Sequence, residues 1–158
     1  MSRRWCAKVS LNQAMADQPK LIALDLGERR IGLAVSGPGD LALPAGHIVR
    51  TKLVQDIMLV IAAATDRKAD GIVVGIPHNP QGITDTAAES ARGFIRGLRK
   101  AMTEGALLEV YEMDERFTSI EAEGLLRQSG VQPSRDRASV DETAAMLILQ
   151  RYLYSLQG

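Results

Sequence analysis

The sequence is poor in cysteine, in aromatic residues and in net charge, and it has no long hydrophobic run. A single cysteine, Cys6, in 158 residues excludes an internal disulfide framework and a cysteine-rich zinc site, and agrees with a reducing cytoplasm. Aromatic residues make up only 4%, which argues against base stacking on an exposed aromatic platform. No apolar run approaches the roughly 18 residues of a transmembrane helix, so we expect a cytoplasmic protein with no membrane partner.

Acidic and basic residues balance, at nineteen of each. Binding to nucleic acid must therefore depend on a local basic patch rather than on net charge. The length suits one domain with a sizeable core. Residues 1–19 carry Arg3, Arg4 and Lys8 without a continuous apolar segment, so they are expected to form a flexible N-terminal extension and not a secretory signal. The domain itself is expected to span residues 20–158.

The stretch 21–36 organises the rest of the chain. Four apolar residues lead into Asp25, turn residues follow at 27–30, and a second apolar run covers 31–35. This pattern predicts a β-hairpin whose first strand is buried on both faces, with Asp25 at its end. A carboxylate there is costly unless water, a hydrogen bond or a cation compensates it. Two interpretations stay open: Asp25 and Gly27 only build the turn, or they belong to a metal or phosphate site at the sheet edge.

Beyond the hairpin, strand and helix patterns alternate. A loose alternation interrupted by Pro44 and Gly46 predicts a strand near a sheet edge, and a β-branched run ending at Pro77 predicts a buried parallel strand. The expected strands cover residues 41–49, 72–76 and 107–111, and the expected helices cover 51–68, 85–102, 119–128 and a segment that opens at Ser139. This order predicts an α/β domain with a mixed sheet and helices packed on it.

Four carboxylates are candidates for one shared site. Asp25 ends the first strand, Asp114 and Glu115 follow the strand at 107–111, and Asp141 lies in the first turn of the last helix. The carboxyl ends of parallel strands meet at one edge of an open sheet, so these groups are expected to converge. Oxygen ligands without His or Cys suit Mg²⁺ or Mn²⁺, and two such ions about 4 Å apart can drive phosphodiester hydrolysis.

Each acidic residue also has a plainer interpretation. Glu115 beside Arg116 can be a surface ion pair, and the charge of Asp141 can simply favour the start of a helix through its dipole.

Four stretches together resemble the bacterial YqgF/RuvX family. They are Asp-Leu-Gly-Glu-Arg-Arg-Ile-Gly-Leu-Ala-Val-Ser at 25–36, Val-Val-Gly-Ile-Pro-His-Asn-Pro-Gln-Gly at 73–82, Asp-Glu-Arg-Phe-Thr-Ser at 114–119, and Val-Asp-Glu-Thr-Ala-Ala-Met-Leu-Ile-Leu-Gln at 140–150. The resemblance spans residues 20–153. Two departures lie in one loop: His78 occupies a place that is commonly apolar, and Gly-Ile-Thr-Asp at 82–85 replaces the family's usual aspartate- or glycine-rich stretch.

The resemblance implies a ribonuclease H-like fold with a mixed five-stranded sheet, and a nuclease whose carboxylates bind divalent metal. By position, Asp25, Glu115 and Asp141 are the implied catalytic residues and metal ligands, and Asp114 is a further candidate ligand. The family's described activities imply two substrates: precursor ribosomal RNA, in maturation of the 5′ end of 16S rRNA, and branched DNA, as a Holliday junction resolvase. A symmetric cut in a junction would favour a homodimer.

Basic residues near the acidic set are the candidates for binding phosphate. They are Arg29, Arg30, His78, Arg116, Arg135 and Arg137. His78 can equally be a solvated loop histidine. A second arginine row at 92, 96 and 99 has helical spacing; it can track a nucleic-acid backbone or form a solvated face.

Two other functions compete with the nuclease. An ATP-binding domain of the actin and sugar-kinase type also carries Asp-Xaa-Gly after its first strand. That class usually adds Thr or Ser at the position of Glu28 and a second domain, and a length of 158 residues argues against it. A binding module that kept the fold and lost catalysis is the other alternative. The acidic set at 25, 115 and 141 argues against it.

Overall fold

The computed structural model describes residues 19–39, 41–77, 86–102, 108–115, 127 and 137–156. Glu115 and Arg137 are described by their backbone only. The expected extension at 1–19 therefore lies outside the described residues except for Pro19, and so does the expected helix at 119–128 except for Arg127. His78, Arg116 and Arg135 also lie outside them.

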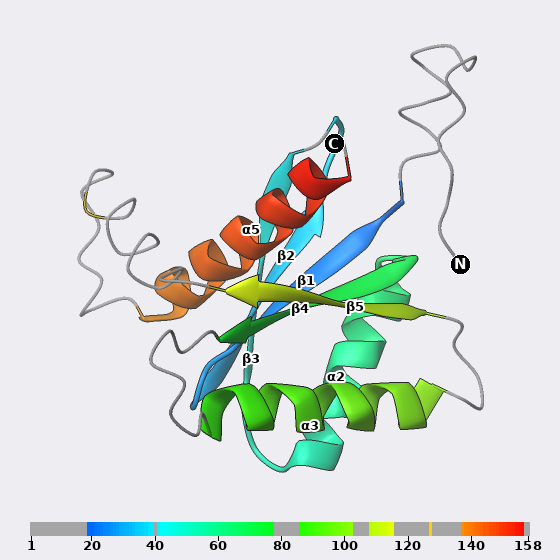
Figure 1. Ribbon diagram of the computed structural model, residues 1–158, viewed down its shortest axis with the longest axis vertical. Coiled ribbons are helices and arrows are strands. Elements are labelled where there is room, and N and C mark those ends of the chain that lie inside the picture. The colour runs from blue at the N-terminus through cyan, green and yellow to red at the C-terminus, as the bar shows by residue number, and fades with distance from the viewer. Residues whose placement is uncertain are drawn as a thin grey trace.

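A mixed five-stranded sheet forms the centre of the molecule, as predicted (Figure 1). Its strands are β1 (Leu21–Leu26), β2 (Arg30–Ser36), β3 (Ala42–Val49), β4 (Gly71–Pro77) and β5 (Glu109–Glu115). Their order is β3-β2-β1-β4-β5, with β1–β2 and β2–β3 antiparallel and β1–β4 and β4–β5 parallel. The predicted hairpin, the edge strand near 41–49 and the parallel strand near 72–76 are all present.

Among the described residues, three helices cover the two faces of this sheet. Helices α2 (Leu53–Asp66) and α3 (Thr86–Ala101) lie on one face, and α5 (Arg137–Ser155) crosses the other (Figure 1). The first two helices match the predicted ranges closely, and the last begins two residues before the expected start at Ser139. Within the described residues, no helix has both the length and the apolar character needed to cross a membrane.

The fifth strand is longer than predicted. The prediction ended it at residue 111 and placed 112–115 after it, but β5 continues to Glu115, which pairs with Pro77 of β4. The physical reason is that β5 is an edge strand, so Glu112 and Asp114 can point to solvent without leaving the sheet. Charge alone therefore did not mark the strand's end.

Alternation along β1 divides the core into two parts. Ile22 and Leu24 pack with α2 and α3, whereas Leu21 and Ala23 pack with α5. Because side chains alternate along a strand, Asp25 follows Ala23 onto the α5 face. The carboxyl end of the central strand thus presents Asp25 toward the helix that carries Asp141.

Candidate active site

Two of the predicted acidic residues meet at the end of β1. Asp25 pairs with Gly32 across the β1–β2 hairpin. A Cβ atom on Gly32 would lie 2.0 Å from the backbone oxygen of Asp141, so glycine is required for α5 to approach β2 this closely. A Cβ atom on Gly27 would lie 3.6 Å from Asp141 Oδ1. The Asp141 carboxylate therefore lies beside the turn that directly follows Asp25.

The electrostatics of Asp25 reflect this convergence. Burial, and after it the negative charge of Asp141, raises the pKa of the Asp25 carboxyl from 3.8 to about 7. Within the described part of the chain, no residue donates a hydrogen bond to the Asp25 carboxylate or forms an ion pair with it. A half-buried carboxylate that lies near a second acid and has no donor among the described residues suits a bound cation.

The third acidic position reaches the same edge of the sheet. Strands β1, β4 and β5 run parallel, with Leu24 paired to Val74 and Pro77 paired to Glu115, so their carboxyl ends lie together. Glu115 follows Tyr111 and Met113, which pack with α5, at the two-residue spacing of a strand. Among the described side chains, which do not include that of Glu115, no group of three acidic, His or Cys residues could hold a metal ion.

Asp114, the further candidate ligand, lies on the other face. It follows Val110, which packs with the α2 and α3 core, by four residues, and its side chain is exposed. Strand alternation therefore directs it away from Asp25 and Asp141.

The predicted basic residues divide between the two faces. Arg29 is exposed in the turn after Asp25, and Arg30 is the first residue of β2. Arg137 begins α5, one turn before Asp141. The arginine row at 92, 96 and 99 lies on α3, on the opposite face, and Arg99 Nη2 donates to the Val110 carbonyl over 3.0 Å. The residues beside the acidic pair are thus better placed to meet a phosphate backbone than the α3 row.

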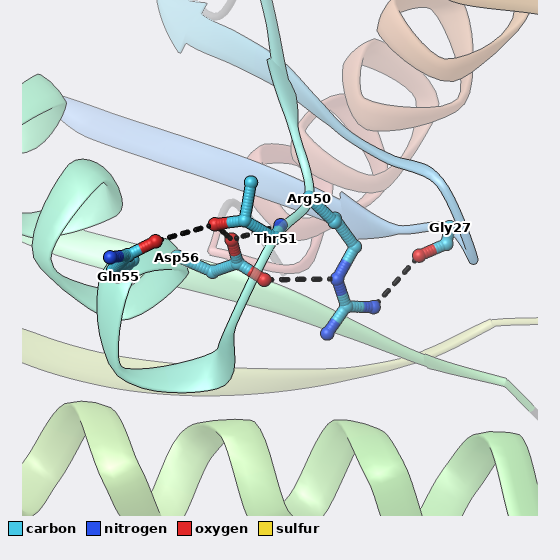
Figure 2. A network of polar contacts seen from close by, with 5 residues as sticks. All are labelled: Gly27, Arg50, Thr51, Gln55 and Asp56. Carbon is cyan, nitrogen blue, oxygen red and sulfur yellow. Dashed lines mark hydrogen bonds and ion pairs between the residues drawn. The ribbon is translucent and has the colours of Figure 1, made fainter.

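Sequence reasoning did not single out Gly32 or Arg50. A glycine inside a strand is a signal of close backbone approach, so Gly32 could have been found. Arg50 follows β3 and reaches the Gly27 carbonyl with Nη1 over 2.8 Å and the Asp56 carboxylate with Nε over 3.4 Å (Figure 2). No local pattern marks an arginine whose partners are 23 and 6 residues away.

Comparison with known proteins agrees with this geometry. Residues 19–155 match the family described as RuvX, Holliday junction resolvase. A protein of Acaryochloris marina whose name includes the words pre-16S rRNA nuclease is 35% identical over 133 residues, which are 84% of this chain and 90% of that protein.

Two solved structures share the fold. One is Thermus thermophilus RuvC in complex with a Holliday junction substrate, with a TM-score of 0.58, 17% identity, and coverage of 89% of this chain and 97% of that one. The other is the fowlpox virus resolvase in complex with Holliday junction DNA, with a TM-score of 0.53, 13% identity, and coverage of 88% and 99%. These likenesses confirm the predicted ribonuclease H-like fold.

Proposed function

Because this chain belongs to the RuvX family, we propose that it is a nuclease that hydrolyses phosphodiester bonds in structured nucleic acid. The observation that carries the proposal is the convergence of Asp25 and Asp141, where β1 ends and α5 begins. The carboxyl ends of β4 and β5 meet the same edge, so Glu115 is proposed as the third catalytic carboxylate.

The substrate we propose first is precursor ribosomal RNA, with the 5′ end of pre-16S rRNA as the processed end. The support is the name of the Acaryochloris marina relative, which is 35% identical over most of both chains. Such an enzyme would act in the cytoplasm in ribosome biogenesis. The family description favours a second candidate, resolution of Holliday junctions, in which two copies of the chain would make a symmetric cut.

Hydrolysis by this class of nuclease depends on divalent metal, and we propose that two Mg²⁺ or Mn²⁺ ions are the cofactor here. The donor chemistry fits: the candidate ligands are carboxylate oxygens without His or Cys, which hard divalent cations prefer. Burial, and after it the charge of Asp141, raises the pKa of Asp25 and so disfavours its ionised form. A cation would favour that form.

Each part of the site would then have a distinct role. Asp25, from β1, and Asp141, from α5, would hold the metal, which supplies an activated water and charge stabilisation at the leaving oxygen. The start of α5 favours the ionised form of Asp141 through the helix dipole. Arg29, in the adjoining turn, and Arg30, at the start of β2, would bind the phosphates that flank the cleaved bond.

The test is cleavage of labelled precursor rRNA, single-stranded DNA and a four-way junction by the wild-type protein and Asp25→Asn, with Mg²⁺, Mn²⁺ or a chelator. Asn keeps the shape of Asp but is a poorer ligand. Asp66→Asn is the matched control, because it removes one exposed carboxylate at the end of α2, on the other face of the sheet. We expect metal-dependent cutting by the wild type and by Asp66→Asn, and none by Asp25→Asn.

The substrate that is cut best distinguishes ribosomal RNA processing from junction resolution. Full activity of Asp25→Asn at saturating metal would refute the assignment of the site. Binding of one substrate without any cutting would favour the binding-module alternative.

A further inference from the structure

The turn between β1 and β2 is held from the face opposite the acidic pair. Arg50 Nη1 donates to the Gly27 carbonyl over 2.8 Å, and the backbone N–H of Arg50 donates to the Arg29 carbonyl over 2.9 Å. Arg50 therefore holds both ends of the turn that follows Asp25. Figure 2 shows its side-chain contact with Gly27.

The Arg50 side chain is itself held on the α2 and α3 side of the sheet. Its Nε donates to Asp56 Oδ2 over 3.4 Å, and Asp56, which is 1% exposed, also accepts the Thr51 N–H over 2.9 Å. The guanidinium carbon lies 5.9 Å from the centre of the Phe94 ring, within the range of a cation–π contact. Contacts from two helices thus restrict where the guanidinium can lie.

Gly27 connects the contacts of Arg50 to the acidic pair, Asp25 and Asp141. Its N–H donates to the Arg30 carbonyl over 2.9 Å, which closes the turn, and a Cβ atom at this position would lie 3.6 Å from Asp141 Oδ1. Asp25 is only two residues away. A shift of Gly27 would therefore change how the carboxylates of Asp25 and Asp141 lie relative to each other.

We propose that Arg50 is a positioning residue for the reaction: by fixing Gly27, it sets the separation of the Asp25 and Asp141 carboxylates and hence their affinity for the cation. This inference rests on the proposed metal-dependent activity of that pair. Arginine suits the role because its rigid fork of donors reaches Gly27 and Asp56 together, whereas the ammonium of lysine is a compact charge on a flexible stem.

The experiment compares Arg50→Lys with Arg92→Lys, an exposed arginine of α3 that serves as the matched control. The measurements are kcat and KM for cleavage, the Kd of Mn²⁺ by calorimetry, and hydrogen exchange of the Gly27 amide in the metal-free protein. For Arg50→Lys we expect about a 10- to 100-fold loss in kcat or in Mn²⁺ affinity, an unchanged KM and faster exchange of Gly27. Arg92→Lys should match the wild type in all of them.

Wild-type kcat, Mn²⁺ affinity and Gly27 exchange in Arg50→Lys would overturn the proposal. If Arg50→Lys does not fold, Asp56→Asn replaces it in the experiment. Asn can still accept the Thr51 N–H but cannot form an ion pair with the guanidinium of Arg50. Unchanged kcat and Mn²⁺ affinity in this variant would also overturn the proposal. A wild type that neither cleaves nor binds Mn²⁺ would refute the proposed function instead. Gly27 exchange would then still decide whether Arg50 fixes the turn.

Discussion

Two aspartates on opposite sides of the sheet show how the same side chain can serve structure or chemistry. Asp56, on the α2 side, is 1% exposed and accepts hydrogen bonds from Arg50 and from the Thr51 backbone. Asp25, on the α5 side, has no donor among the described residues, and Asp141 lies nearby. Arg50 and the Thr51 N–H compensate the charge of Asp56, whereas no described residue compensates the charge of Asp25. That difference is what supports the proposal that Asp25 is a metal ligand.

The largest expected effect is on catalysis, in Asp141→Asn. If Asp141 holds the metal as proposed, its loss removes several kcal/mol of transition-state stabilisation, so we expect cleavage to fall by on the order of 10³-fold. Glu142→Gln, at the next position of α5, is the control and should keep near wild-type activity. Steady-state cleavage at saturating metal measures both variants. Equal losses in the two would show that α5 tolerates no change there and that Asp141 has no special role.

Asp56→Ala should act on stability instead. Removing one partner of a buried ion pair leaves the other charge uncompensated, so we expect the free energy of unfolding to fall by roughly 3 kcal/mol. Urea denaturation of the metal-free protein measures it. The same experiment on Asp25→Asn should show no comparable loss, because no described donor would be left without its acceptor. A large loss in Asp25→Asn would break the contrast between the two aspartates.

Much of this contrast could be anticipated from residue patterns. The apolar run into Asp25 predicted a central strand that ends in a carboxylate, and the parallel-strand pattern near Pro77 placed the later acidic residues at the same edge. The structure confirms the central strand and the parallel pairing of β1, β4 and β5, whose carboxyl ends lie at one edge. Local periodicity is enough for these features because each depends on a few neighbouring residues.

The rest depends on contacts between distant segments. The approach of Asp141 to Asp25 needs the bare backbone of Gly32 under α5, a packing relation across more than 100 residues. The contacts of Arg50 with Asp56 and Phe94 can form only when the end of β3 packs against α2 and α3. The end of β5 was predicted too early, because its pairing with β4, and not its own polarity, decides how far it runs.

Gly32→Ala tests the packing that brings the acids together. The added methyl group would lie 2.0 Å from the Asp141 backbone oxygen, so α5 must shift. Overpacking of this kind costs about 1–3 kcal/mol of stability, and we expect cleavage to fall as well. Gly93→Ala on α3 is the control, because its nearest neighbour is the flexible end of Arg96 at 3.6 Å. It should be neutral or slightly stabilising. Wild-type cleavage by Gly32→Ala would show that the activity does not depend on how closely α5 approaches β2.

The pH dependence of stability should also distinguish the two aspartates. Because the folded state raises the pKa of Asp25 from 3.8 to about 7, its contribution is fully present below pH 3.8 and is lost as pH rises through 7. We therefore expect the metal-free wild type to lose up to roughly 2 kcal/mol between pH 5.5 and 8.5 relative to Asp25→Asn. Urea denaturation in chelator measures this difference. Parallel pH profiles for the two proteins would contradict it.

The smallest expected effect concerns which face of the molecule meets nucleic acid. Arg29 is exposed in the turn beside Asp25, whereas Arg96 is exposed on α3, on the side of Asp56. If the substrate lies over the acidic pair, Arg29→Ala should weaken binding several-fold and lower the salt slope of the affinity by about 1, as expected for one lost phosphate contact. Arg96→Ala removes the same charge and should leave that slope unchanged. Titrations over a salt series measure both. A larger loss of slope in Arg96→Ala would place the nucleic acid on the α3 face, away from Asp25 and Asp141.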